Sequence, residues 1–136
     1  MSSGAVIVRD ATPEDWPAIW LVDRTVVAVE PGGRVVGTAN MYANRPGPGL
    51  HVASGSFMVE PAHWGKGAGR ALCEEGLDWA KRQGYRAMQF NAVAESNARA
   101  IALYESLGFE TVGTVPEAFE HPTLGYVGLC VMYRRL

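Results

Sequence analysis

A short glycine-rich loop is the part of the sequence whose residue types best suit chemistry. It holds, in order, Gly65, Lys66, Gly67, Gly69 and Arg70. Glycine has no Cβ, so its backbone adopts positive φ angles and approaches a ligand closely. The apolar run before the loop predicts a strand, and the pattern after it predicts a helix whose first N–H groups have no partners within the helix. Unpaired amides, the positive end of a helix dipole and two cations favour a bound anion such as phosphate.

The loop does not fit the two best-known nucleotide motifs. A nucleoside triphosphate loop reads G-x-x-x-x-G-K-[ST], but Gly67 stands where the serine or threonine belongs. A dinucleotide fingerprint reads G-x-G-x-x-G, and counted from Gly65 its third glycine is replaced by Arg70. The acidic residue expected about 20 positions later is also missing, since that region reads Met88-Gln89-Phe90. Both nucleotide motifs are therefore excluded.

The loop resembles instead the coenzyme A loop of the GNAT superfamily of N-acyltransferases. That loop is written [QR]-x-x-G-x-[GA] after a V-x-P strand end, and the sequence from Trp64 to Gly69 matches it after Val59-Glu60-Pro61. Trp64 departs from the pattern, which prefers Gln or Arg. A glycine turn without a ligand is the alternative interpretation. The resemblance implies acetyl-CoA (coenzyme A) as cofactor, bound by Met58, Val59, Trp64, Gly65, Lys66, Gly67, Ala68, Gly69 and Arg70.

A second stretch, residues 97–109, resembles the last helix of GNAT enzymes, N-x-x-A-x-x-[LF]-Y-x-x-x-G-F, at every defined position. By this resemblance Asn97 and Ala100 contact the cofactor, Asn97 through the pantetheine amides, and Tyr104 points its hydroxyl at the thioester sulfur. Asn97 and Tyr104 share one helix face, about 10 Å apart along its axis at 1.5 Å per residue. A helix N-cap is the alternative role for Asn97, and a core tyrosine is the alternative for Tyr104.

Together the two motifs predict acetyl transfer to an amine. The amine attacks the thioester carbonyl, and the departing thiolate takes a proton from Tyr104, whose reference pKa is about 10, as general acid. A backbone N–H near Val59 is expected to stabilise the oxyanion. For the general base the sequence leaves open Glu60, His51, His63 and a chain of waters.

The acceptor side is less clearly marked. Asn91 lies in an alternating strand where the sheet is expected to open, so it is a candidate to hold an acceptor carboxylate or amide, unless it is a ladder residue facing solvent. Phe119, His121 and Tyr126 are expected to line the pocket from a long aromatic segment. The resemblance is closest to bacterial GNAT members and implies an N-acetyltransferase for a small molecule such as an amino acid. A non-catalytic acyl-CoA sensor and a protein or peptide N-acetyltransferase are the alternatives.

The elements that position these residues are predicted to form an α+β fold. The helices are expected over about 68–84 and 97–107, with an irregular connection over 116–125. The strand, helix, strand unit around the loop predicts two parallel neighbours. By resemblance the sheet is mixed and mostly antiparallel, with a parallel splayed central pair and helices on both faces. The predicted strands are 5–8, 24–30, 34–42, 51–59, 87–93, 109–115 and 126–133.

One departure from the family concerns the segment between the first two strands. GNAT proteins usually place two helices there, which line the acceptor pocket, whereas residues 11–23 leave room for one short helix that Thr12 would cap. We expect that a mobile segment near Trp20-Leu21 is omitted from the sequence. Loss of this layer would otherwise expose apolar sheet surface and favour a homodimer.

Composition narrows the class of protein. The chain has 136 residues, which fits one domain over 1–136, and a net charge of −2, which argues against a nucleic-acid partner. No apolar run approaches the roughly 18 residues of a membrane span, and Cys73 and Cys130 do not form a disulfide framework. A cytoplasmic protein without membrane contact is expected. The three histidines lack metal-ligand spacing, so no metal site is predicted.

Overall fold

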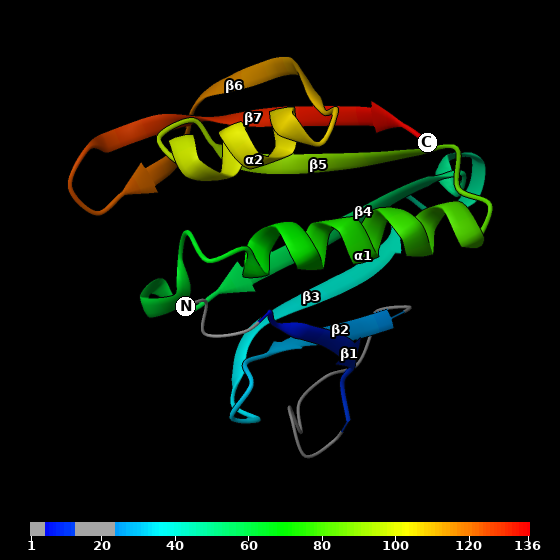
Figure 1. Cartoon of the computed structure of the whole chain (residues 1–136). Coiled ribbons are helices and arrows are strands. Elements are labelled where there is room, and N and C mark those ends of the chain that lie inside the picture. The colour runs from blue at the N-terminus through cyan, green and yellow to red at the C-terminus, as the bar shows by residue number, and fades with distance from the viewer. Residues whose placement is uncertain (1–4, 13–23) are drawn as a thin grey trace.

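The computed structural model describes residues 5–12 and 24–136. They form a seven-stranded sheet in the order β1-β2-β3-β4-β5-β7-β6 (Figure 1). The strands are β1 (Ile7–Asp10), β2 (Arg24–Val29), β3 (Val35–Ala43), β4 (Val52–Val59), β5 (Ala87–Ala94), β6 (Glu110–His121) and β7 (Gly125–Arg135). The helices are α1 (Ala68–Arg82) and α2 (Ala98–Ser106), with 3-10 turns η1 (Gly47–Gly49) and η2 (Pro61–His63). This arrangement confirms the predicted α+β class.

The central strands β4 and β5 run parallel, whereas the other neighbouring pairs are antiparallel. Two ladder pairs join β4 to β5, Val52 with Ala87 and Ala53 with Met88. Beyond these pairs the two strands continue but diverge, and Figure 1 shows them separating toward their carboxyl ends. The structure therefore confirms the mixed, mostly antiparallel sheet with a splayed parallel pair at its centre.

Both described helices cover the same face of the sheet and lie in front of it in Figure 1. Leu72 of α1 is fully buried in the core, and Arg24 of β2 donates to Glu75 of α1 at 2.7 Å, which ties this helix to the sheet. Tyr104 of α2 joins the same core, because its ring centroid lies 4.6 Å from that of Phe90 in β5. The helix predicted between the first two strands, with its suggested omission, falls on residues 13–23, outside the described residues.

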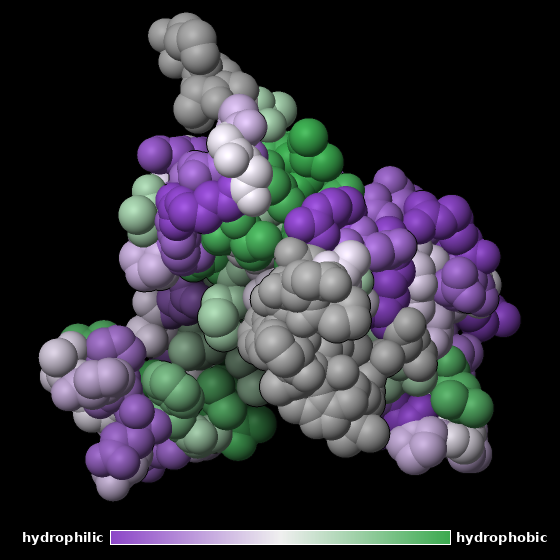
Figure 2. Space-filling view, turned by 90° about the horizontal axis from the view of Figure 1, so that it is seen from below, coloured by the Kyte–Doolittle hydropathy of each residue, from purple (hydrophilic) through white to green (hydrophobic). Residues whose placement is uncertain are grey.

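Side-chain alternation along the strands gives the sheet two faces. The helix face is defined by residues in or against the core: Ala39, Met41, Ala53, Phe57, Met88 and Phe90. The opposite face is defined by the residues that alternate with them: Thr38, Asn40, Tyr42, Ser54, Ser56, Met58, Gln89 and Asn91. Seen from the side of β1 and β2, hydrophobic residues gather in separate groups between hydrophilic ones (Figure 2).

The ends of α1 follow from its flanking glycines. Gly67 precedes the helix with a φ of 90°, a left-handed conformation that favours glycine. Gly84 follows the helix with a φ of 88°, and Lys81 and Arg82 lie in the last turn, where positive charge suits the helix dipole. The prediction that the helix ends near Gly84 is thus confirmed. None of the described helices has the length and apolar character needed to cross a membrane.

The last hairpin corrects one prediction. We expected an irregular connection over 116–125, but β6 runs on to His121 and pairs with β7 up to the turn. A register shift between Val115 and Phe119 absorbs Pro116, which cannot donate to a ladder, and Glu117, which has a φ of 52°. The His121 ring closes the turn, because its Nδ1 accepts from the Leu124 N–H at 3.1 Å. Proline and a bulge therefore bend the strand without ending it.

Candidate functional site

The three loop glycines have two different roles. Gly65 and Gly67 adopt positive φ angles of 77° and 90°, as the loop prediction requires. Gly69 does not, because it already lies in the first turn of α1. A Cβ on Gly69 would lie 3.4 Å from Leu103 of α2, which is an ordinary van der Waals contact. The expectation that all three glycines serve through unusual φ angles is corrected for Gly69.

The edge of β4 that faces β5 supplies free backbone groups. The Glu60 N–H donates to the Val36 carbonyl at 2.9 Å, so Glu60 and its alternate neighbours turn their polar groups toward β3. Gly55, Phe57 and Val59 consequently direct their N–H and C=O groups toward β5, at a level where the two strands have diverged. The N–H expected near Val59 for an oxyanion is therefore directed into the space between the diverging strands β4 and β5, which we call the gap.

Trp64 connects the loop to both sides of the gap. Its indole N–H donates to the Val59 carbonyl at 2.9 Å. The Arg99 guanidinium of α2 lies over the same ring, 5.3 Å from its centroid, a cation–π contact. Trp64 remains 52% exposed. At the position where the family pattern prefers Gln or Arg, this chain thus has an aromatic side chain that occupies one carbonyl of the gap and contacts α2.

Asn97 caps α2, as the alternative interpretation proposed. Its Oδ1 accepts from the Ala100 N–H at 3.2 Å. The cap occupies the oxygen and leaves the two hydrogens of the exposed Nδ2 group for a ligand. The cap and the predicted cofactor contact of Asn97 are compatible. Ala100 lies half-buried on the next turn and packs against the core.

Tyr104 is held between α2 and the sheet by aromatic packing. Its ring centroid lies 4.6 Å from that of Phe90 and 5.9 Å from that of Phe109. Burial, and secondarily the nearby Cys73, raises the pKa of Tyr104 to about 12. The phenol therefore stays protonated at neutral pH and can donate a hydrogen bond. Burial likewise raises the pKa of Cys73 to about 12, so this buried thiol is not activated as a nucleophile.

The remaining loop residues predicted to bind the cofactor lie around the start of α1. Ala68 is its first residue and is buried, whereas Lys66 and Arg70 are exposed. Arg70 donates to the Ser106 hydroxyl of α2 at 2.7 Å. The two cations thus flank the amides of the helix start, which suits a phosphate. Met58 lies apart on the opposite face and is 67% exposed.

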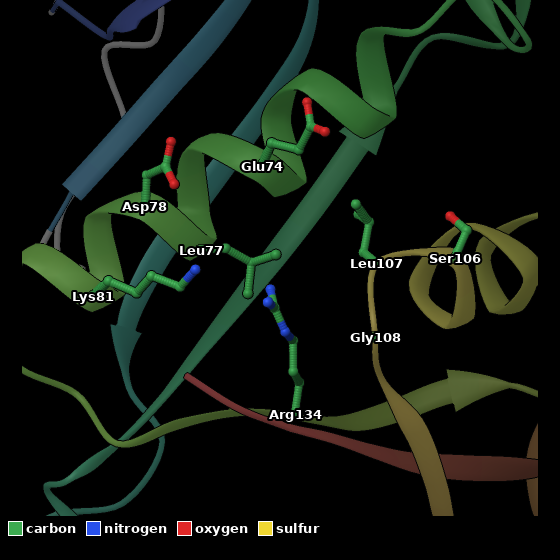
Figure 3. Close-up of a pocket in the computed structure, with 8 residues that line it drawn as sticks. All are labelled: Glu74, Leu77, Asp78, Lys81, Ser106, Leu107, Gly108 and Arg134. Carbon is green, nitrogen blue, oxygen red and sulfur yellow. The ribbon is translucent and has the colours of Figure 1, made fainter.

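Farther along α1 lies a groove of about 460 Å³ (Figure 3). It runs between α1 and the turn after α2, and Arg134 of β7 points up into it between Leu77 and Leu107. Sequence reasoning did not single out this groove, because its residues carry no motif. It begins at Ser106, the partner of Arg70, and is lined by Glu74, Leu77, Asp78, Lys81, Ser106, Leu107, Gly108 and Arg134.

The predicted general bases are poorly placed for proton abstraction. Arg34 donates to Glu60 at 2.9 Å and holds the pKa of that carboxyl below its usual value, which makes Glu60 a weaker base. His63 is buried, with its ring nitrogens 3.5–3.6 Å from Glu60 and Glu30. His51 directly precedes β4, at the closed end of the splayed pair. A water chain is left as the expected route for the proton.

On the opposite face the structure joins Asn91 to residues that sequence reasoning missed. The Asn91 Nδ2 donates to Asn44 Oδ1 at 2.7 Å, and the Gln89 Nε2 donates to Asn91 Oδ1 at 2.9 Å. We call these three residues the amide cluster. Asn44 follows β3, so the cluster spans β4 from one neighbouring strand to the other. Asn44 carries no local signal in sequence, because its contact depends on the alignment of three strands.

The three predicted pocket residues of the last hairpin separate in space. Cys130 is in the core, so alternation places Val127, and with it the paired Phe119, on the opposite face. Tyr126 faces the other way and is 65% exposed. His121 stabilises its own turn, where its Nδ1 also accepts from the Thr123 N–H at 3.1 Å. Phe119 alone of these three lies on the face that carries Asn91, and substrate contact stays a prediction for all of them.

The comparisons with known proteins agree with this geometry. Residues 6–109 match the model of the acetyltransferase (GNAT) family. The chain therefore belongs to the GNAT family.

Among solved structures, a GCN5-related N-acetyltransferase from Kribbella flavida is 51% identical, with a TM-score of 0.90 over 97% of this chain and 98% of that one. The structure of yncA from Salmonella typhimurium with its cofactor acetyl-CoA is 27% identical, with a TM-score of 0.81 over 98% and 95% of the two chains. L-amino acid N-acyltransferase MnaT from Escherichia coli (strain K12) is 32% identical over 83% of this chain and 69% of its own length. The first curated relatives are matched over smaller shares, 40%, 11% and 57% of their lengths.

Proposed function

We propose that this chain transfers the acetyl group of acetyl-CoA to the primary amine of a small molecule such as an amino acid. The observation that carries the proposal is the divergence of β4 from β5 just before the glycine loop. It leaves an unpaired strand edge beside a helix start suited to an anion. The amides of an extended pantetheine arm can pair with such an edge as an added strand does, while the pyrophosphate contacts the loop. The relative MnaT, an L-amino acid N-acyltransferase, supports an amine acceptor.

The cofactor would enter from the helix face. Lys66 and Arg70 offset phosphate charge, and the amides after Gly67 donate to phosphate oxygens. The Nδ2 of Asn97 is left to donate to a pantetheine carbonyl, since its Oδ1 caps α2. The thioester then lies in the gap, between the Val59 backbone and Tyr104, and the acceptor amine reaches it from the opposite face.

The reaction needs no covalent enzyme intermediate. The amine nitrogen forms a bond to the acetyl carbonyl carbon, and the carbonyl oxygen becomes an oxyanion that the Val59 N–H stabilises. The carbon–sulfur bond then breaks, and its electron pair leaves with the sulfur. One proton leaves the amine nitrogen through water, and one proton is added to the sulfur. The products are the acetamide and free coenzyme A.

Tyr104 is proposed as the donor to the departing sulfur. Its raised pKa of about 12 keeps it protonated, but it also makes the phenol a weaker acid than a thiol, whose reference pKa is about 8.5. We therefore assign Tyr104 a hydrogen bond to the sulfur that strengthens as negative charge develops, while the proton that the sulfur finally takes comes from water. A donor of this kind stabilises the transition state more than the bound thioester.

A thiol-release assay tests the proposal. The chain is mixed with acetyl-CoA and a panel of primary amines, and free coenzyme A is measured together with the mass of the acetylated product. We expect release above the spontaneous rate with at least one amine and a loss of most of this rate in Tyr104→Phe. Binding of acetyl-CoA without turnover of any amine would instead favour the non-catalytic sensor, and turnover of peptides alone would favour a peptide acetyltransferase.

A further inference from the structure

We propose that Trp64 and Arg99 close the gap in the free protein, and that acetyl-CoA opens it by taking over the hydrogen bond that Trp64 makes to Val59. This inference rests on the proposed function and concerns how the same site admits its cofactor. We call the two side chains, Trp64 and Arg99, the clasp. Within the clasp, the indole N–H is an internal competitor of the pantetheine arm.

The clasp joins the two sides of the gap at the end next to the glycine loop. Trp64 follows β4 through the turn η2, and its indole N–H donates to the Val59 carbonyl at 2.9 Å. Arg99 belongs to α2, which follows β5, and its guanidinium lies 5.3 Å from the centroid of the Trp64 ring. The Arg99 Nη1 also lies 3.5 Å from the position that a Cβ on Gly65 would take. The pair therefore reaches from α2, over the start of the glycine loop, to the end of β4.

The Trp64 ring lies where a ligand that pairs with β4 would run. Because Glu60 bonds to β3, both polar groups of Val59 are directed into the gap, and the indole that reaches the Val59 carbonyl lies there too. A carbonyl oxygen can accept two hydrogen bonds. Here, however, the donor is part of a bulky ring, which occupies the space along the strand edge. A ligand that pairs with this edge has to displace the ring.

The covalent structure of acetyl-CoA brings an amide to the same carbonyl. The thioester carbonyl carbon and the first pantetheine amide nitrogen are separated by as many bonds as, in a strand, a carbonyl carbon and the nitrogen of the next residue but one. In a parallel ladder, two such groups pair with the N–H and the C=O of one residue. With the thioester oxygen at the Val59 N–H, the amide N–H thus meets the Val59 carbonyl. The arm then continues toward the glycine loop, where the phosphates are expected.

The exchange of donors explains how the site can open. The indole N–H and the pantetheine N–H are both neutral donors, so the Val59 carbonyl stays paired when one replaces the other. Trp64 is 52% exposed, so its side chain can turn outward into water. Only the open form accepts the pantetheine arm. The measured affinity is therefore the intrinsic affinity reduced by the fraction of the protein that is open.

The Trp64→Phe variant tests the competition. It removes the indole N–H and keeps an aromatic ring beside Arg99. In the free variant, water pairs with the Val59 carbonyl and is displaced more easily than a tethered ring. Because the bound state does not use the indole, we expect the affinity for acetyl-CoA in calorimetric titration to rise about fivefold, the effect of one net hydrogen bond.

Two controls limit the interpretation. Adenosine 3′-phosphate 5′-diphosphate carries the phosphates of the cofactor without the pantetheine arm, so the closed clasp admits it. Its affinity should differ by less than about twofold between the parent and Trp64→Phe. Tyr42→Phe removes a polar group from an aromatic residue of the opposite face, a hydroxyl 3.2 Å from the Ser56 hydroxyl. The affinity of this variant for acetyl-CoA should be unchanged.

Tryptophan fluorescence reports the opening directly. The chain has four tryptophans, and subtraction of the Trp64→Phe spectrum isolates the emission of Trp64. This emission should move to longer wavelength when acetyl-CoA binds, because the indole enters water, but not when the nucleotide alone binds. Circular dichroism shows whether the variant folds; if Trp64→Phe does not, Trp64→Leu replaces it.

The outcomes separate this inference from the proposed function. Weaker acetyl-CoA binding by folded Trp64→Phe would make the indole a cofactor contact, as the family resemblance implies, and would overturn the inference while leaving the acetyltransferase activity intact. Unchanged affinity, or a Trp64 emission that acetyl-CoA does not alter, would overturn it as well. Tighter binding by the variant with no turnover of any amine would support the clasp and overturn the proposed function. A parent protein that does not bind acetyl-CoA would overturn both.

Discussion

The two faces of the sheet beside the gap differ in how they can recognise a ligand. On the helix face, two glycines of left-handed conformation, the start of α1 and the cations Lys66 and Arg70 surround the expected phosphate position. On the opposite face, neutral amides and hydroxyls from three strands meet across the splayed pair. The first face relies on the backbone and on charge, which a short motif can specify. The second relies on side chains that become neighbours only through strand alignment.

This difference explains why the two faces are unequally visible in sequence. A glycine loop is suited to a phosphate group, which all acyl-CoA cofactors share, and a few neighbouring residues are enough to form it. A surface of amides and hydroxyls depends on side chains from three strands, so it forms no such pattern. Variants that affect one face and not the other test whether the two are independent.

The largest expected effect comes from the backbone of the helix face. Gly67→Val places a β-branched residue at a φ of 90°, where a non-glycine residue costs roughly 1–2 kcal/mol, and it covers amides that face the phosphates. We expect acetyl-CoA affinity in calorimetric titration to fall by more than about 1000-fold, while circular dichroism stays close to that of the parent.

Gly113→Val is the matched control for this change. Gly113 is exposed on β6, and a Cβ built there meets no atom within 4 Å. The affinity of the Gly113→Val variant for acetyl-CoA should be unchanged. Parental affinity in a folded Gly67→Val variant would place the phosphates elsewhere.

The next effect concerns the buried acids of the helix face at alkaline pH. A group whose pKa is raised in the folded state holds its proton more tightly there, so its stabilising contribution is complete below the unfolded pKa and is lost as pH rises through the folded pKa. For Cys73 that window runs from 9.0 to about 12, and for Tyr104 from 10.0 to about 12. Urea unfolding should show a loss on the order of 2–4 kcal/mol from Cys73 across its window.

Cys73→Ala tests the assignment. The variant is expected to be less stable at pH 7, because it leaves a small cavity, but its unfolding free energy should fall less steeply with pH above 9.0. An unchanged slope would show that the Cys73 thiol is not the group being titrated.

A smaller effect is expected from Tyr104→Phe, which removes the proposed donor and keeps the ring. The kcat should fall about 100-fold, toward the lower end of the range for positioned proton donors, because a thiolate leaves tolerably without help. Acetyl-CoA affinity and the melting temperature should change little. A Phe variant that keeps full turnover but is about 1 kcal/mol less stable would make Tyr104 a core residue.

The smallest effect is expected from a single exposed cation of the helix face. Lys66→Ala should weaken acetyl-CoA binding about threefold at low salt and less at high salt, because exposed charges are screened. Arg135→Ala, at the far end of β7, removes the same charge as a control and should leave the affinity unchanged. An equal loss in both variants would mean that general attraction, and not a local contact, accounts for the effect.

The sequence predicted the framework well for identifiable reasons. Glycine, proline and apolar periodicity are local signals, and they specified the loop, both described helices and the parallel pair. The predicted end of β6 was wrong. In sequence Pro116 indicates the end of a strand, but here a bulge accommodates the proline and the strand continues. Gly69 was misinterpreted, because it already lies in the first turn of α1 and has no positive φ. The contacts of Trp64 with Val59 and Arg99, and of Asn91 with Asn44, join residues that no local pattern relates.

The narrow junction between β4 and β5 also affects how the fold is held together. Two ladder pairs connect the sheet of β1 to β4 with that of β5 to β7, and α1 carries the chain from one to the other. A pantetheine arm in the gap would act as a missing strand that completes the interrupted ladder. Stability then depends on the metabolic supply of cofactor, since a ligand at 100 times its Kd stabilises the folded state by about 2.7 kcal/mol. In a cell, the amount of acetyl-CoA would therefore influence how long the protein persists as well as how fast it works.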